Sequence, residues 1–305
     1  MVNGRKIGEG VYVIVLVIFT VYMLLDTFVI TKKLAVVSNQ SRSVSSSSDS
    51  SVSNSSGKSG SVTKSSTAYE DDNIKIVLID YRENDTDIHM ADVKVSSSEY
   101  LKTAFAQSSY GRNVTEKTSD IAESVNAILA INGDYYGAQE SGYVIRNGVI
   151  YRETAKSGNE DLVIYGDGSF EIIDEDDITA EELLEKGAQN VLAFGPALVE
   201  DGSVSVTEDE EVGKAMASNP RTAIGIIDEN HYVFVVADGR TSDNEGLSLY
   251  ELAEFMESLG VQTAYNLDGG GSSTMYFNGQ IINKPTTNGS SIKERSVSDI
   301  VYIGY

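Results

Sequence analysis

The chain contains no cysteine and only two histidines, His89 and His231. Without cysteine there are no disulfide bonds and no thiolate metal sites. Two histidines do not provide a zinc site of the HExxH or Cys/His kind, and a Ser-His-Asp triad would need one of them. The G-x-S-x-G, Walker A and G-x-G-x-x-G motifs are also missing. These absences argue against zinc hydrolases, serine hydrolases and nucleotide-binding folds.

Basic residues are scarce as well. The chain has 23 Lys and Arg against 46 Asp and Glu, which gives a formal net charge of −23. Nucleic-acid binding depends on neutralising phosphates with Lys and Arg, so no nucleic-acid partner is expected. Much of the negative charge lies in runs at residues 174–177, 181–182 and 208–211, which are typical of solvated loops and helix faces. Oxygen-rich Asp and Asn positions leave room for a hard cation such as Ca²⁺, without the spacing of an EF-hand.

The first 68 residues differ in composition from the rest. Residues 11–30 form an apolar run of about the length that crosses a bilayer, interrupted by polar Thr20, Asp26 and Thr27. A cleaved signal peptide is the alternative, but the run is long and lacks an Ala-x-Ala site. Residues 38–68 contain 16 serines in 31 positions, and such a segment buries too little apolar surface to fold.

These features predict four parts. Residues 1–10 form a short cytoplasmic N-terminus, and residues 11–30 a single-pass membrane anchor. Residues 31–68 form a disordered Ser-rich linker. Residues 69–305 form one folded domain, large enough for a substantial core and placed outside the cytoplasm.

Periodicity within residues 69–305 predicts a mixed α+β fold with a largely antiparallel or mixed curved sheet and a few packed helices. Apolar strands recur between turn sequences, of which Asn147-Gly148 and Asn278-Gly279 favour type I′ hairpin turns. The clearest helix covers residues 248–259, where Ser248 and Glu251 form a capping box before an apolar stripe at helical spacing. A shorter helix is expected over residues 179–186.

Residues 266–273 read Asn-Leu-Asp-Gly-Gly-Gly-Ser-Ser. This stretch places Asp268 at the end of an apolar strand and follows it with three glycines and two hydroxyls. Glycine removes the side chains that would keep a ligand from the backbone, and exposed amides at a strand end suit an anion. A flexible Gly-Ser connector is the alternative, but apolar strands flank the stretch on both sides.

Asp134, Asp238 and Asp268 share one context, since each ends an apolar strand and has glycine beside it. Strand ends at one edge of a sheet are where α/β folds build sites. Asp-Gly is also favoured in ordinary turns, so a single member of the set identifies nothing. Three of them, each beside other polar residues such as Asn132, together predict a site.

Arginines in otherwise neutral segments are candidates for binding an anion. Arg221 leads into a strand, Arg240 follows Asp238-Gly239, and Arg295 precedes Ser-Val-Ser. The guanidinium fork matches a phosphate with two parallel hydrogen bonds. The alternative for each arginine is a surface ion pair, which contributes little.

Five sequence blocks together resemble the phosphodiester glycosidase family. In family order they are residues 130–136, 220–225, 236–240, 266–273 and 294–298, and the resemblance spans roughly residues 80–303. It implies hydrolysis of a sugar-1-phosphodiester. The predicted catalytic residues are Asp134, Asp238 and Asp268, and the predicted substrate-binding residues are Asn132, Arg221, Arg240, Gly269, Gly270, Gly271, Ser272 and Arg295. The N-terminal anchor, in place of the cysteine-rich additions of animal members, implies a bacterial protein that faces the cell surface.

A phosphodiester is a better leaving group than an alcohol, so the reaction needs less help from a general acid than ordinary glycoside hydrolysis does. It needs stabilisation of the departing phosphate and one carboxylate that activates water or stabilises positive charge at the anomeric carbon. Our hypothesis assigns the carboxylate role to Asp268 and the phosphate to Arg240 and Arg295. The backbone amides of residues 269–271 would cradle the phosphate. The residues leave open which aspartate is nucleophile, base or metal ligand.

The expected substrate is a phosphorylated glycan of the cell surface, wall or exopolysaccharide. Two other functions fit the sequence. The first is a non-catalytic module that binds phosphorylated wall glycans with the same pocket. The second is an exopolysaccharide assembly factor whose acidic surface organises cations or partners.

Overall fold

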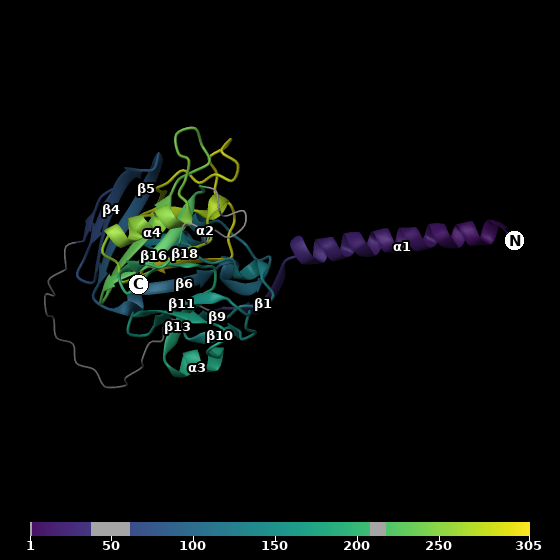
Figure 1. Ribbon diagram of the computed structural model, residues 1–305, viewed down its shortest axis with the longest axis horizontal. Coiled ribbons are helices and arrows are strands. Elements are labelled where there is room, and N and C mark those ends of the chain that lie inside the picture. Colours follow the sequence, from purple (N-terminus) through teal and green to yellow (C-terminus); the bar gives the residue numbers. More distant parts are fainter. Residues whose placement is uncertain (1, 38–61, 208–217) are drawn as a thin grey trace, which may run out of the picture.

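The structure is a computed structural model that describes residues 2–37, 62–207 and 218–305. Helix α1 (Val2–Phe28) extends away from a body that contains the other described helices and nearly all of the strands (Figure 1). The acidic run at residues 208–211 lies outside the described residues.

A nine-stranded antiparallel sheet forms the largest part of the body. Its strands are β2 (Thr63–Lys64), β3 (Ala68–Glu70), β4 (Ile74–Glu83), β5 (Thr86–Val95), β14 (Ala197–Glu200), β15 (Ser203–Val204), β16 (Arg221–Asp228), β17 (His231–Ala237) and β18 (Thr263–Leu267). Their order across the sheet is β15-β14-β18-β16-β17-β5-β4-β3-β2. At the centre of the sheet the hairpin of β16 and β17 pairs with the hairpin of β4 and β5, which lies far from it in the sequence.

Two five-stranded antiparallel sheets complete the body. One has the order β10-β9-β13-β11-β12 and consists of β9 (Val144–Arg146), β10 (Val149–Arg152), β11 (Glu160–Tyr165), β12 (Phe170–Asp174) and β13 (Ala188–Leu192). The other has the order β20-β19-β8-β21-β6 and consists of β6 (Leu101–Phe105), β8 (Leu129–Asn132), β19 (Met275–Phe277), β20 (Gln280–Ile281) and β21 (Asp299–Ile303). The helices α2 (Thr118–Ser124), α3 (Ala180–Glu185) and α4 (Leu249–Ser258) are short. The mixed α+β class and the antiparallel sheets predicted from the sequence are confirmed.

All three sheets contribute to one apolar core. Phe234 from the nine-stranded sheet, Leu162 from the second sheet and Leu129 from the third are fully buried in the same cluster. On the other face of the nine-stranded sheet, α4 packs against β14 and β18 and buries Leu252 and Met256 in a second apolar cluster. Burial of side chains of this size contributes about 1.5–3 kcal/mol each. This packing fixes the position of β18, which leads into the Asn-Leu-Asp-Gly-Gly-Gly-Ser-Ser stretch.

The ends of three strands meet at one place. Residue 268, just after β18, donates its backbone N–H to the carbonyl of Gly133, just after β8, at 3.2 Å. Strand β16 runs antiparallel to β18 with Thr222 opposite Leu267, so the start of β16 lies at the same end. The sequence predicted that the strands ending at Asp134, Asp238 and Asp268 converge; the ends of β8 and β18 meet directly, and the end of β17 lies beside the start of β16, where Ala237 pairs with Arg221.

The N-terminal segment is attached to the body by a strand. β1 (Lys32–Val36) pairs antiparallel with β7 (Ser109–Arg112), and Ala35 and Val37 pack against a buried cluster that includes Tyr110. A side chain at Gly111 would place its Cβ 2.0 Å from the carbonyl oxygen of Lys32, so this pairing requires glycine there. The sequence predicted a disordered linker over residues 31–68, and both ends of that range carry strands instead, β1 and β2. Residues 38–61 lie outside the described residues.

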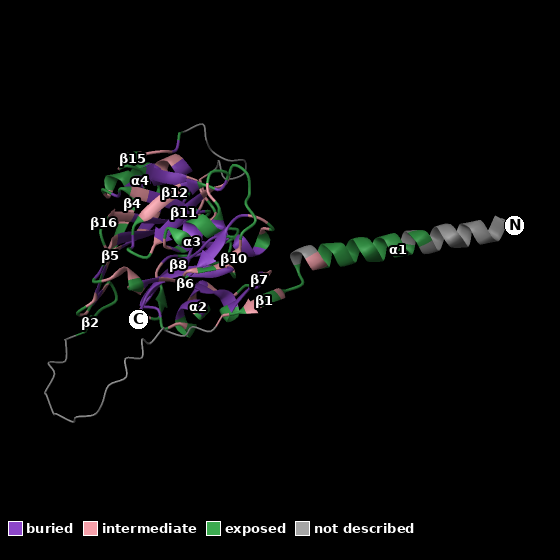
Figure 2. Cartoon of the chain, turned by 90° about the horizontal axis from the view of Figure 1, so that it is seen from below, coloured by how far each residue is buried: buried purple, intermediate pink, exposed green. Residues whose placement is uncertain are grey.

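Helix α1 covers most of residues 11–30, for which the sequence predicted a membrane anchor. The side chains described along its apolar part are exposed (Figure 2). Within the described ranges, no helix combines the length and the apolar character that a membrane crossing requires. The predicted transmembrane helix is not confirmed.

Candidate active site

A pocket of about 710 Å³ opens where these strand ends meet. Its lining comes from the nine-stranded sheet, the loops around it and the edge of the second sheet. The lining residues are Gly158, Asn159, Glu160, Asp174, Phe194, Gly195, Pro196, Asn219, Arg221, Arg240, Leu249, Asn266, Asp268, Gly269, Gly270 and Arg295. Three arginines and one of the predicted catalytic aspartates therefore share one cavity.

Asp268 is the predicted catalytic residue that lines this pocket. Ser272 Oγ donates a hydrogen bond to its Oδ2 at 2.6 Å, and Arg295 Nη2 lies 3.3 Å from the same oxygen. Burial raises the pKa of Asp268, and the hydroxyl of Ser272 and the charge of Arg295 only partly offset that effect. A carboxylate with a raised pKa is a better proton acceptor, which suits a general base.

Arg295 contacts Asp268 and two neutral groups at the pocket, whereas Arg240 donates hydrogen bonds to neutral groups. Arg295 donates to Ser272 Oγ and to the carbonyl of Gly269, and its side chain is 40% exposed. Arg240 donates to Asn219 Oδ1 and, through Nη1, to the carbonyl of Thr287 at 2.7 Å. Among the described residues no carboxylate forms a salt bridge with Arg240. Its charge is therefore not neutralised by that part of the chain and can act on a bound anion.

Arg221 is the most enclosed of the three arginines. It is 4% exposed, at the start of β16, and its Nε donates to the carbonyl of Leu247 at 2.8 Å. Enclosure lowers the local dielectric and strengthens the interaction of a guanidinium with an anion. The pocket thus combines one enclosed and two more accessible guanidinium groups.

The glycines after Asp268 lie where neighbouring groups approach the backbone closely. Gly270 has a φ of +62°, and a Cβ there would lie 2.9 Å from Arg240 Nη2. A Cβ at Gly271 would lie 2.4 Å from Thr287 Oγ1. The Gly270 N–H donates to the carbonyl of Pro220 at 2.7 Å, so this amide of the predicted cradle is already engaged. The glycines let Arg240 and the neighbouring loop approach the strand end.

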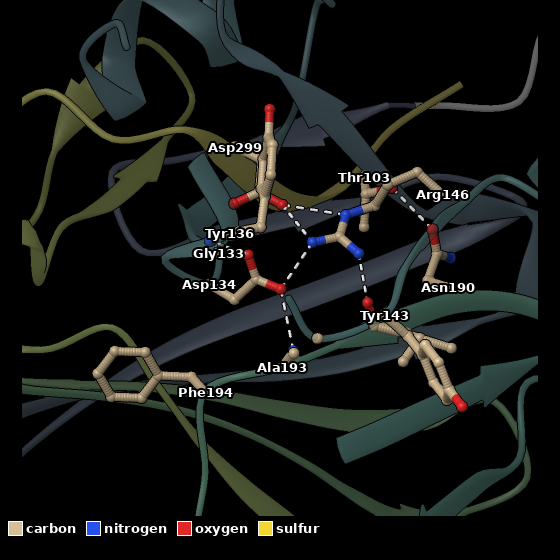
Figure 3. A network of polar contacts seen from close by, with 12 residues as sticks. Thr103, Gly133, Asp134, Tyr136, Tyr143, Arg146, Asn190, Ala193, Phe194 and Asp299 are labelled. Atoms are coloured by element: carbon tan, nitrogen blue, oxygen red, sulfur yellow. Dashed lines mark hydrogen bonds and ion pairs between the residues drawn. The ribbon is translucent and has the colours of Figure 1, made fainter. Parts of the chain in front are cut away.

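Asp134 lies outside the pocket lining, in a buried ionic network (Figure 3). Its Oδ2 pairs with Arg146 Nη2 at 2.8 Å, and the same nitrogen lies 2.7 Å from Asp299 Oδ2. Burial and the neighbouring charge of Asp134 raise the pKa of Asp299 to about 7. Asp134 Oδ2 also accepts a hydrogen bond from the backbone N–H of Ala193 at 2.9 Å. Asp134 therefore positions the segment that carries Phe194 to the pocket wall.

Asp238 and Asn132 also lie outside the lining and position other groups. Asp238 Oδ1 accepts hydrogen bonds from Asn283 Nδ2 at 3.2 Å and from the backbone of Lys284 at 2.8 Å, and its Oδ2 lies 3.7 Å from His89 Nε2. Asn132 Nδ2 donates to the carbonyl of Asp268 at 2.6 Å. Asn132 therefore fixes the backbone at Asp268.

Two of the predicted binding residues, Gly271 and Ser272, act from behind the pocket lining through Thr287 and Asp268. The predicted Ca²⁺ site has no identified ligand set, because the described ranges contain no group of three or more carboxylate or histidine side chains that could hold a metal.

One wall of the pocket was missed by the sequence analysis. Glu160 and Asp174 belong to the second sheet, and Phe194 lies in the loop between β13 and β14. Asn219 directly precedes the Pro-Arg-Thr block, which could have identified it. Asn266 begins the Asn-Leu-Asp stretch, and its position there could likewise have identified it. For Glu160, Asp174 and Phe194 no local sequence feature indicates a site.

Comparison with known proteins gives a consistent result. A sequence model of the phosphodiester glycosidase family matches residues 125–304. The SPbeta prophage-derived uncharacterized protein YomE of Bacillus subtilis is 30% identical over 218 residues, which cover 70% of this chain and 33% of that protein. Mouse N-acetylglucosamine-1-phosphodiester α-N-acetylglucosaminidase is 36% identical over 91 residues, 28% of this chain and 17% of the enzyme. The chain thus spans a third or less of the length of these relatives.

Two solved structures share the fold. The catalytic domain of zebrafish N-acetylglucosamine-1-phosphodiester α-N-acetylglucosaminidase, auto-inhibited by its pro-peptide, superposes with a TM-score of 0.61 at 22% identity, covering 76% of this chain and 83% of that one. A hypothetical protein from Synechocystis gives a TM-score of 0.53 at 16% identity, covering 76% and 62%.

Proposed function

The chain belongs to the phosphodiester glycosidase family, and on that premise we propose that its pocket hydrolyses a sugar-1-phosphodiester. In this reaction the bond between C1 of the sugar and the bridging oxygen breaks. The oxygen of water joins C1, one proton of that water is removed, and the phosphate leaves as a monoester. The sugar is released with a free hydroxyl at C1.

The observation that carries this proposal is the meeting of Asp268 with three arginines in one pocket. A phosphodiester gains negative charge as it leaves, and guanidinium groups that are already positioned stabilise that charge in the transition state. Arg240 and Arg221 would bind the phosphate oxygens. Arg295, which also contacts Asp268, would lie between the phosphate and the carboxylate.

Asp268 is assigned the carboxylate role. Its raised pKa makes it a competent proton acceptor, and its hydrogen bonds to Ser272 and Arg295 hold it in one orientation. It either takes the proton from the attacking water or stabilises positive charge at C1. The pocket lining also contains Glu160 and Asp174, whose negative charges disfavour a second phosphate and suit the hydroxyls of a sugar.

The names of the mammalian relatives make N-acetylglucosamine-1-phosphodiesters the first substrates to test. A cell-surface, wall or exopolysaccharide glycan, and a protein anchored in the cell membrane with this domain outside, are further parts of the proposal that come from the sequence. Fractionation of the source cells and protease accessibility of the domain test the location.

The test of activity uses the full chain and a methyl phosphodiester of N-acetylglucosamine, with and without EDTA. We expect release of the free sugar and methyl phosphate, detected by chromatography. Tight binding of the diester without any release would favour the non-catalytic binding module instead. Loss of activity in EDTA would indicate a metal. Neither binding nor release across a panel of sugar-1-phosphodiesters would contradict the proposed function.

A further inference from the structure

Asn266 lies in β18, and Asp268 follows the end of that strand two residues later. Both residues line the pocket. Asn266 is 2% exposed. It is therefore a buried polar residue beside the carboxylate of the proposed reaction.

The side-chain amide of Asn266 is fixed in one orientation. Its Nδ2 donates to the carbonyl of Gly195 at 2.7 Å, and its backbone N–H donates to the carbonyl of Pro196 at 3.1 Å. Because a carbonyl oxygen cannot donate, the atom next to Gly195 must be the nitrogen. The remaining polar atom of the amide, Oδ1, is then an acceptor.

Oδ1 of Asn266 is buried and has no hydrogen-bond partner among the described residues. Buried polar atoms in folded proteins nearly always have a partner, and an unpaired one is destabilising. The atom belongs to a residue of the pocket lining, so a ligand in the pocket can supply the missing donor. The hydrogen bond from Nδ2 to the carbonyl of Gly195 keeps Oδ1 in place as an acceptor.

The segment that holds the Asn266 amide is itself positioned by the buried ionic network of Asp134. Asp134 accepts the N–H of Ala193, and the next residues, Phe194 to Pro196, form the pocket wall against which Asn266 is held. Phe194 is 39% exposed and presents an aromatic ring on this wall. Aromatic rings offer an apolar surface to a sugar ring. A sugar packed there would lie beside Asn266, whose side chain is held by the carbonyl of Gly195 in the same wall.

We propose that Oδ1 of Asn266 accepts a hydrogen bond from the substituent at C2 of the sugar, either a hydroxyl or the N–H of an acylamino group. This inference rests on the proposed function, because it places C1 of the sugar at Asp268. C2 is the carbon next to C1, and Asn266 and Asp268 lie two residues apart in the lining of the same pocket. Hydrogen bonds to the C2 substituent also strengthen in the transition state of glycoside cleavage. Asn266 is thus a specificity-determining residue.

The test compares substrates in the unaltered full chain, so that it does not depend on the folding of a variant. The probes are methyl phosphodiesters of glucose, 2-deoxyglucose and 4-deoxyglucose, together with the N-acetylglucosamine compound. We expect kcat/KM to fall by about 10- to 100-fold for the 2-deoxy compound relative to glucose. The loss for the 4-deoxy compound should be smaller.

The variant Asn266→Ala then shows whether the preference for the C2 substituent depends on this residue. In this variant the preference for the glucose compound over the 2-deoxy compound should fall to about onefold, while the preference over the 4-deoxy compound stays as in the parent. Asn190→Ala, which changes a buried asparagine of β13 outside the pocket lining, is the matched control and should keep the parent's preference for the C2 hydroxyl. An unchanged 2-deoxy preference in Asn266→Ala, or equal rates on glucose and 2-deoxyglucose in the parent, would overturn the inference while leaving the proposed function intact.

If the chain cleaves none of these compounds, binding is measured by calorimetry with the same series. A C2-dependent affinity that Asn266→Ala removes would support the inference even though the catalytic function had failed. Equal affinities for the glucose and 2-deoxyglucose compounds, or no binding of either, would overturn it.

Discussion

Asp268 and Asp134 each follow an apolar strand, each has a glycine neighbour, and each pairs with an arginine, yet they do different things. Asp268 lies at the pocket with Arg295, whose side chain is 40% exposed. Asp134 pairs with Arg146, whose side chain is 2% exposed, and shares it with Asp299. The same residue types therefore give a site in one place and a structural support in the other. Enclosure decides between them, because a ligand reaches only the pair that faces the cavity.

The sharpest way to break this comparison is to neutralise both aspartates. We expect Asp268→Asn to lower kcat/KM by about 10²- to 10⁴-fold, the range associated with loss of a general base, with little change in the thermal midpoint. Steady-state kinetics on a sugar-1-phosphodiester and thermal unfolding measure the two effects. Turnover near that of the parent would show that Asp268 takes no part in the chemistry. Asp134→Asn is the partner variant, and we expect it to lose stability.

The second largest effect is expected at Arg146. Arg146→Met should lower the free energy of unfolding by about 3–5 kcal/mol, because it leaves Asp134 and Asp299 buried without a counter-charge. Urea unfolding gives the value. Arg112→Met is the matched control: Arg112 pairs with the exposed Glu140, and this loss should cost about 1 kcal/mol or less. Equal losses for both variants would show that enclosure does not distinguish these pairs.

A smaller effect is expected from Arg295→Lys. Lysine keeps the charge but cannot form the fork that contacts Ser272, Gly269 and Asp268 together, so kcat/KM should fall by about 10-fold with stability nearly unchanged. Arg82→Lys, where the arginine pairs with Asp87 outside the pocket, should leave kcat/KM unchanged. A similar loss of kcat/KM in both variants would show that the effect does not depend on the contacts that Arg295 makes at the pocket.

The mildest test uses pH. The pKa of Asp299 is raised in the folded state to about 7, above its ordinary value of 3.8, so the folded protein holds that proton more tightly than the unfolded chain does. The stability that this provides is complete below about 3.8 and is lost as the pH rises through about 7. Asp299→Asn should therefore lose less stability than the parent between pH 5 and pH 8, as measured by urea unfolding at about these two pH values. Parallel pH profiles would contradict the assignment.

Local features of the fold could be predicted because their causes are local. The capping boxes at Ser248 and Thr179 start α4 and α3, and Asn147-Gly148 closes the hairpin of β9 and β10. Each of these depends on a few adjacent residues. The class of the fold followed from many such elements together.

Which aspartate lines the pocket and which ones support the fold could not be predicted in the same way. Asp134, Asp238 and Asp268 have equivalent sequence contexts, and only tertiary packing buries the first two behind the pocket wall. Arg146 sits beside a hairpin turn, where a surface position is the ordinary expectation, and nothing nearby in the sequence indicates that it is fully enclosed. Glu160 reaches the pocket because the second sheet packs against the first, which is a long-range contact.

The pairing of β1 with β7 limits how far the pocket can move from α1. β1 begins four residues after α1 ends, and Thr31 Oγ1 donates a hydrogen bond to the carbonyl of Asn113 at 3.2 Å. The distance between the pocket and α1 is therefore set by these few residues before β1 and not by the part of the chain that follows it.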